Sequence, residues 1–173
     1  MLFTLFALTL ASPFELRSPD IRAGQPMAKQ QEFQGFGCSG GNTSPALVWS
    51  GAPAGTKAFA ITVYDPDAPT GSGWWHWQLI NIPASVTRLP TDAGNVKAAK
   101  LPKGAMQMRN DYGQHAFGGA CPPEGHGVHR YQFTVHALSK AIEVDRSSSA
   151  ALVGYMLNAN SLGTATLEAT YRR

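Results

Sequence analysis

The feature that most constrains this chain is the alternation of apolar and polar residues in short segments, separated by loops rich in glycine and proline. Successive side chains of a β-strand point to opposite faces, so a period of two predicts half-buried strands. Residues 164–171 show this period cleanly. Residues 57–64 are apolar on both faces, which predicts a strand buried on both sides. Further strands are predicted at residues 46–49, 75–82 and 131–138.

One segment near the C-terminus has helical spacing instead. Serines at residues 147–149 are favoured helix N-caps. An apolar stripe follows them, and then residues suited to ending a helix. The stripe consists of Leu152, Val153, Met156 and Leu157, and the ending residues are Asn158, Asn160 and Gly163. We therefore predict a mostly β fold, an antiparallel β-sandwich with a helix near the C-terminus.

Composition limits the class of protein. At 173 residues the chain fits one domain with a full hydrophobic core. The formal net charge is only +3, and the basic residues do not cluster among aromatic ones. Nucleic acid is therefore not an expected partner. No segment reads as an integral membrane helix.

The N-terminal residues 1–11 are apolar and uncharged, but too short to span a bilayer. They are typical of the hydrophobic part of a secretory signal, although the preceding positive charge is missing. We expect a leader over residues 1–12, one domain over residues 13–173, and a periplasmic or secreted protein. The alternative is an ordinary strand in a cytoplasmic protein. Cys38 and Cys121 form either one disulfide or two buried thiols.

Two proline-rich loops carry the candidate functional residues. One is residues 65–69, Asp-Pro-Asp-Ala-Pro, and the other begins with Cys121-Pro122-Pro123. Proline stiffens a loop, and loops at strand ends commonly hold binding residues. We expect the loops to bring together a small anion pocket in which Asp65 favours protonated histidines that donate from both ring nitrogens. The histidines are His76 and His129, Tyr131 would add a hydroxyl, and Trp74 and Pro122 would supply apolar walls.

Other readings of these residues lead to other chemistry. Asp65, Asp67, His76 and His129 match no standard metal-ligand spacing, so we predict neither a metal ion nor a cofactor. Ser44 and Cys121 are candidate nucleophiles, but neither lies in a nucleophile-elbow pattern, so we predict that the protein is not an enzyme. The remaining histidines are interpreted as surface or structural residues: His115, His126 and His136.

Taken in order, these motifs resemble those of the phosphatidylethanolamine-binding protein family, in its bacterial and archaeal Raf-kinase-inhibitor-like branch. Residues 65–69 with Trp74 and His76 resemble one signature, and residues 122–123 with 127–131 resemble another. Residues 37–45, 109–113 and 169–172 add to the resemblance, which runs from about residue 14 to the end. The position beside His76 that is a histidine in many eukaryotic members is Trp75 here, as is usual in the bacterial branch.

The resemblance implies two antiparallel sheets with a few peripheral helices and an anion pocket at one end. It implies a ligand-binding set of Asp65, Trp74, His76, Pro122, Pro123, His129 and Tyr131. Residues 14–18 resemble the family's first strand, so the preceding residues are extra. This favours a leader and, with it, a Cys38–Cys121 disulfide.

The first functional hypothesis is a non-enzymatic binding protein for phosphate or phosphorylated headgroups, with tighter binding as the pH falls from roughly 7.5 to 5.5. The alternative is an inhibitor or regulator of a protein partner, a serine protease or a kinase. A hydrolase using Asp65 and His129 is the third hypothesis. Family resemblance also implies a homodimer.

Overall fold

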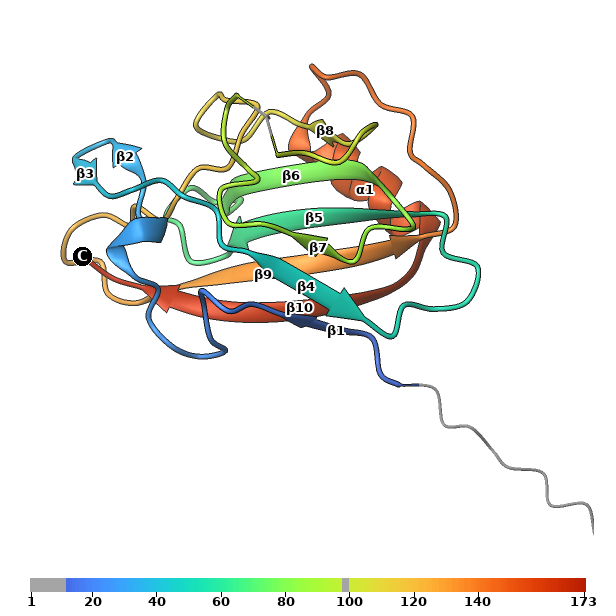
Figure 1. Cartoon of the computed structure of the whole chain (residues 1–173). Coiled ribbons are helices and arrows are strands. Elements are labelled where there is room, and N and C mark those ends of the chain that lie inside the picture. The colour runs from blue at the N-terminus through green and yellow to red at the C-terminus, as the bar shows by residue number, and fades with distance from the viewer. Residues whose placement is uncertain (1–11, 98–99) are drawn as a thin grey trace, which may run out of the picture.

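The computed structural model describes residues 12–97 and 100–173. The predicted leader, apart from its last residue, lies outside the described residues. A five-stranded antiparallel sheet has the order β10-β9-β5-β6-β8 (Figure 1). Its strands are β5 (Ala58–Asp65), β6 (Trp74–Pro83), β8 (Met106–Gln107), β9 (His129–Leu138) and β10 (Ser161–Tyr171).

A smaller sheet covers one face of the large one. It has the order β1-β4-β7, formed by β1 (Glu15–Arg17), β4 (Leu47–Ser50) and β7 (Arg88–Leu89). The main core lies between the sheets, where Leu47 and Trp49 of β4 pack with Phe59 and Ile61 of β5. The sandwich of two antiparallel sheets predicted from the sequence is confirmed.

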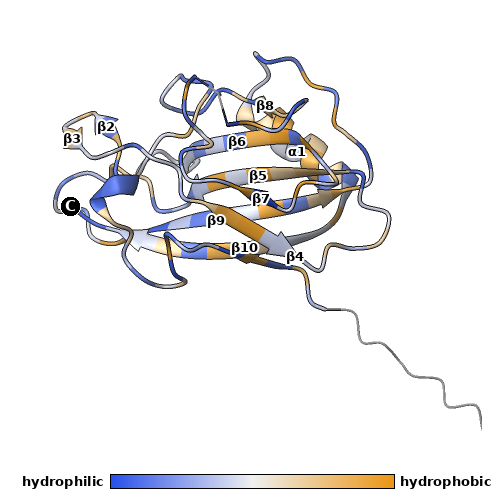
Figure 2. Ribbon diagram, in the orientation of Figure 1, coloured by the Kyte–Doolittle hydropathy of each residue, from blue (hydrophilic) through white to orange (hydrophobic). Residues whose placement is uncertain are grey.

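The helix α1 (Ala150–Asn160) packs on the opposite face of the large sheet, where Val153 and Leu157 join a second buried cluster. Figure 2 shows hydrophobic residues on α1 and along the middle of this sheet. Two small elements lie outside the layers: a 3-10 helix, η1 (Lys29–Gln31), and a short hairpin of β2 (Gln34–Gly35) and β3 (Cys38–Ser39).

The predicted helix is confirmed with one correction. Ser149 is the N-cap, and its hydroxyl accepts a hydrogen bond from the Leu152 N–H. Leu152, a member of the apolar stripe, is 46% exposed, whereas Val153 and Leu157 are the buried residues of the helix. Gly163 does not end the helix, because the chain passes from Asn160 directly into β10 and Gly163 lies at an irregularity of that strand.

His136 is buried in β9, where its Nε2 lies 3.0 Å from the Thr62 hydroxyl. Burial lowers the pKa of His136 from 6.5 to about 4. Below pH 6.5 the unfolded chain binds a proton on this ring that the folded chain does not bind. Stability must therefore fall as the pH falls from 6.5 towards 4.

We expect the protonation of His136 in the unfolded chain to lower the free energy of unfolding by about 2–3 kcal/mol when the pH falls from 7 to 4.5. Urea unfolding at the two pH values measures the change, and the His136→Gln variant should lose less stability in acid than the wild type. An identical acid dependence in both proteins would show that another group is responsible.

Candidate functional site

The strand order places the candidate residues at one end of the large sheet. β5 is antiparallel to both β6 and β9, so the end of β5 lies beside the beginnings of its two neighbours. Asp65 is the last residue of β5, and it pairs with Trp74, the first residue of β6. His129 is the first residue of β9. These residues, which are far apart in the sequence, therefore meet at the same end of the large sheet.

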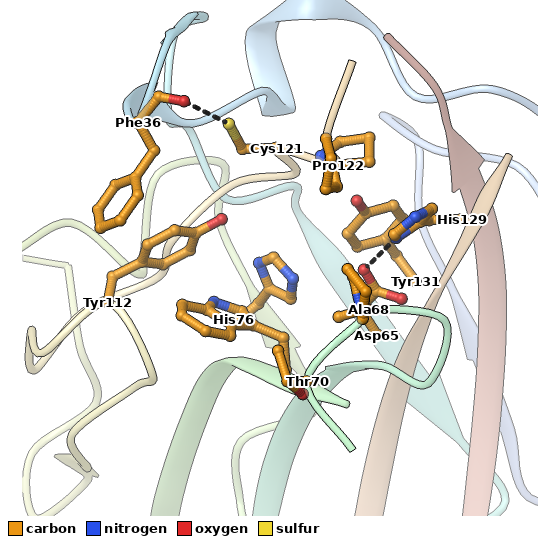
Figure 3. A pocket seen from close by; sticks show the side chains of 13 residues that line it. Phe36, Asp65, Ala68, Thr70, His76, Tyr112, Cys121, Pro122, His129 and Tyr131 are labelled. Atoms are coloured by element: carbon orange, nitrogen blue, oxygen red, sulfur yellow. Dashed lines mark hydrogen bonds and ion pairs between the residues drawn. The ribbon is translucent and has the colours of Figure 1, made fainter. Parts of the chain in front are cut away.

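A pocket of about 180 Å³ opens at this end of the sheet, between the strand ends and the adjoining loops (Figure 3). All seven residues predicted to bind a ligand line it: Asp65, Trp74, His76, Pro122, Pro123, His129 and Tyr131. The sequence motifs did not assign a binding role to the other six lining residues, which are Phe36, Ala68, Pro69, Thr70, Tyr112 and Cys121.

Asp65 is held by two hydrogen bonds at the base of the pocket. One carboxylate oxygen accepts from the Asp67 N–H at 2.8 Å, and the other lies 2.7 Å from His129 Nδ1. Both side chains are almost fully buried. Because a carboxylate can only accept, His129 Nδ1 carries a hydrogen and donates it to Asp65.

His126 continues this chain, because its Nδ1 lies 2.8 Å from His129 Nε2. Both ring nitrogens of His129 are therefore occupied by protein groups. His126 is exposed, in agreement with its interpretation as a surface residue, but its contact with His129 was not predicted. Its contact with His129 depends on the turn at residues 123–126, where His126 N–H donates to the Pro123 carbonyl, and a sequence pattern does not reveal that geometry.

His76 is also buried, and its Nδ1 lies 2.8 Å from the Gly118 carbonyl and 3.1 Å from the Gly119 carbonyl. Carbonyl oxygens only accept, so the hydrogen of the neutral ring is on Nδ1. Burial is the main effect on His76 and lowers its pKa, although the two carbonyls and Asp65 oppose the shift. The expected histidinium is therefore wrong for His76, since burial outweighs the attraction of Asp65.

Three buried polar atoms that belong to pocket residues have no hydrogen-bond partner: Trp74 Nε1, His76 Nε2 and the Tyr131 hydroxyl. Burial, followed by the negative charge of Asp65 and, least of all, by a contact with the Asp65 carboxylate, raises the pKa of Tyr131 well above its ordinary value. Its hydroxyl therefore keeps its proton and can donate. The contact with Asp65 does not meet hydrogen-bond geometry, so the hydroxyl has no partner. The His76 ring lies between Tyr112 and Tyr131, with ring-centre distances of 5.6 and 5.1 Å (Figure 3).

The loop after Asp65 is fixed to β9 by Asp67. The Arg130 guanidinium donates two hydrogen bonds to the Asp67 carboxylate, and the Arg130 N–H donates a third. The guanidinium contact is the main cause that lowers the pKa of Asp67 to about 2. A loop held in this way loses little conformational freedom when a ligand binds.

Phe36 and Tyr112 form an aromatic side of the pocket. The Tyr112 hydroxyl donates to the Gly119 carbonyl at 3.1 Å, and its ring stacks on Phe33 with a centre distance of 3.8 Å. Tyr112 lies in the motif at residues 109–113, which gave a signal for family resemblance but not for a role. Phe36 had no signal, because it reaches the pocket from the turn between β2 and β3 with a φ of 54°.

Cys38 and Cys121 are joined by a disulfide, with their Cα atoms 6.0 Å apart. Cys38 begins β3, whereas Cys121 lines the pocket. The bond therefore ties the hairpin that carries Phe36 to the Cys-Pro-Pro wall.

Within residues 12–97 and 100–173, no group of three His, Cys, Asp or Glu side chains is arranged to hold a metal ion. In the same part of the chain, no helix has the length and apolar character needed to cross a membrane.

Comparison with known proteins agrees with this fold. A family model described as phosphatidylethanolamine-binding protein matches residues 17–172. The UPF0098 protein YbcL of Escherichia coli K12 is 59% identical over 162 residues, covering 93% of this chain and 88% of YbcL. The UPF0098 protein YbhB of the same organism is 46% identical over 158 residues, covering 91% of this chain and 99% of YbhB.

Solved structures of members of the same family are also similar to this chain. A crystal structure of Escherichia coli YbcL, described as a new member of the mammalian PEBP family, has a TM-score of 0.91 and 58% identity, covering 94% of this chain and 99% of the other. A homologue from Chlamydia trachomatis has a TM-score of 0.76 and 26% identity, covering 92% and 97%. Sequence and structure both match over nearly the whole chain, and the protein therefore belongs to the phosphatidylethanolamine-binding protein family.

Proposed function

We propose that this protein is a non-catalytic binding protein whose pocket takes phosphate, a phosphorylated headgroup or a similar small anion. The observation that carries the proposal is the set of unpartnered polar atoms on Trp74, His76 and Tyr131. Buried polar groups in native proteins nearly always have hydrogen-bond partners, so three unpartnered atoms on residues that line one pocket favour a ligand that forms hydrogen bonds with them. Membership of the family supports the same class of function.

Two donors can serve the oxygens of such a ligand. Trp74 Nε1–H can only donate, and the Tyr131 hydroxyl keeps its proton. Pro122 and Pro123 add a stiff apolar wall, as is usual for small-molecule pockets.

Isothermal titration with phosphoethanolamine tests the proposal. We expect Trp74→Phe and Tyr131→Phe each to weaken binding about tenfold or more, because each removes one hydrogen bond to a charged group. Tyr155→Phe is the matched control, since Tyr155 is 69% exposed on α1 and should leave the dissociation constant unchanged. Equal affinity in the wild type and both pocket variants would contradict the proposal.

The absence of catalysis is part of the proposal, and it is supported by the state of the two candidate nucleophiles. The Cys121 sulfur is bonded to Cys38. The Ser44 hydroxyl is buried and accepts a hydrogen bond from the Gly94 N–H. Neither group is available for attack on a ligand. Hydrolysis of p-nitrophenyl phosphate by the wild type, lost in His129→Ala, would contradict the non-catalytic role.

A protein partner, such as a serine protease or a kinase, is the second candidate, and one observation favours it. Phe36 lines the pocket while remaining 74% exposed. Exposed aromatic residues at a rim commonly anchor protein partners. Inhibition of a serine protease or a kinase that is lost in Phe36→Ala would support this candidate. No inhibition at micromolar protein would argue against it.

We also propose a periplasmic or secreted location, supported by the disulfide, because such bonds persist in oxidising compartments. Free thiols in protein recovered from the native cell would contradict it. The homodimer stays a prediction, which light scattering of the purified protein would test.

A further inference from the structure

The charges around the pocket set a condition on any anion that binds there. None of the lining residues is a lysine or an arginine, and Asp65 is the acidic one among them. The Arg130 guanidinium near this end of the sheet is already paired with Asp67. The Arg173 guanidinium lies against the disulfide, 2.9 Å from Cys38 Sγ and 3.8 Å from Cys121 Sγ, and is not among the lining residues. Asp111 adds a second negative charge near His76. An anion in this pocket therefore meets the negative charge of Asp65 with no lysine or arginine side chain in the pocket wall itself.

The hydrogen-bond roles of the unpartnered atoms set a second condition. Trp74 Nε1 and the Tyr131 hydroxyl are donors, whereas His76 Nε2 is an acceptor because its ring hydrogen is on Nδ1. His129 cannot take the place of a donor, since Asp65 and His126 occupy both of its nitrogens. The remaining titratable group on the pocket wall, the Tyr112 hydroxyl, already donates to Gly119. A ligand that satisfies the site must accept two hydrogen bonds and donate one.

We infer that the pocket selects the protonated monoanion of a phosphate monoester, with its P–OH donating to His76 Nε2 and its other oxygens accepting from Trp74 and Tyr131. This inference rests on the proposed function and specifies the protonation state of the ligand that the pocket binds. A doubly charged phosphate lacks the donor and adds repulsion from Asp65. A sulfate ester is fully ionised and also lacks the donor.

The pH dependence follows from the ligand. A phosphate monoester takes up its second proton with a pKa of about 6. Affinity should therefore be highest below pH 6 and decline as the pH rises above it, by about 20-fold between pH 5.5 and pH 7.5. Burial lowers the pKa of His76 and so favours the neutral ring, and the Gly118 and Gly119 carbonyls hold the ring hydrogen on Nδ1, which leaves Nε2 as the acceptor.

Methyl phosphate and methyl sulfate form a matched pair for the test. At pH 5.5 both are mostly monoanions of nearly the same shape, and they differ in the proton that methyl phosphate carries. By isothermal titration to the full chain, we expect methyl phosphate to bind on the order of 100-fold more tightly, because methyl sulfate leaves the buried His76 Nε2 facing oxygens that cannot donate.

Two variants locate the effect. His76→Gln can present an amide N–H₂ to methyl sulfate, so it should narrow the gap between the two esters. Asp65→Asn removes a negative charge that both monoanions meet, so it should strengthen the binding of both and leave the gap unchanged. Tyr155→Phe should leave the gap unchanged. The comparison in wild-type protein stands even if one variant fails to fold.

The outcomes separate the two proposals. Equal binding of the two esters at pH 5.5 would overturn the proton requirement and leave the anion pocket standing. Binding of neither ester would overturn both. Selective binding of methyl phosphate that weakens towards pH 7.5 would support both.

Discussion

Replacing Cys38 and Cys121 together with serine is expected to lower the free energy of unfolding by about 4 kcal/mol. The two cysteines are 83 residues apart in the sequence, and they are bonded in the folded protein. Closing a loop of this length restricts the unfolded chain, and the chain-entropy relation gives about 4 kcal/mol for it. Urea unfolding of the wild type and the double variant, both without reductant, measures the difference.

Reductant supplies the control for this prediction. It should lower the unfolding midpoint of the wild type towards that of the double variant, and it should leave the variant unchanged. Equal midpoints for the oxidised wild type and the variant would contradict the stabilising role of the bond. Intact mass should differ by two protons between the oxidised and reduced wild type.

Replacing Asp65 with alanine is expected to lower the free energy of unfolding by about 3 kcal/mol. The substitution leaves His129 Nδ1–H and the Asp67 N–H without their acceptors, and both contacts lie at the buried base of the pocket. Removing one partner of a buried hydrogen-bonded pair costs the full desolvation of the groups left behind. Chemical denaturation at pH 7 gives the value.

Asp65→Asn is the matched comparison, because asparagine keeps the shape and one acceptor oxygen. We expect it to lose less stability than Asp65→Ala, since one of the two contacts can still form. An Asp65→Ala protein as stable as the wild type would mean that this network does not support the fold. Asp65 would then be retained for ligand binding alone.

The fold could be predicted where the sequence has a clear period. The apolar run at residues 57–64, which is apolar on both faces, corresponds to β5, the central strand of the large sheet. Ser149 is the N-cap of α1, as its capping chemistry indicates. Strand ends were less well defined. β9 begins at His129 rather than Tyr131, because its pairing with β10 extends beyond the apolar core to Tyr171.

The predicted residues were brought together at the site, but their protonation could not be read from the sequence. Burial of His76 against two carbonyls lowers its pKa, and the tertiary fold determines that burial. The His126 contact and the approach of Phe36 likewise depend on turn geometry. Loops can be recognised from their composition, but the direction in which a loop side chain points is a tertiary property.

A crystal structure of the protein grown with phosphoethanolamine, compared with that of His129→Ala, tests the central claim most directly. We expect a phosphoryl group between Trp74, His76 and Tyr131, with one oxygen within hydrogen-bond distance of His76 Nε2 and another near the Tyr131 hydroxyl. We expect weaker or absent density for this group in His129→Ala, because Asp65 loses its buried partner. An empty pocket, or a metal ion in place of the phosphoryl group, would contradict the proposed binding of phosphate.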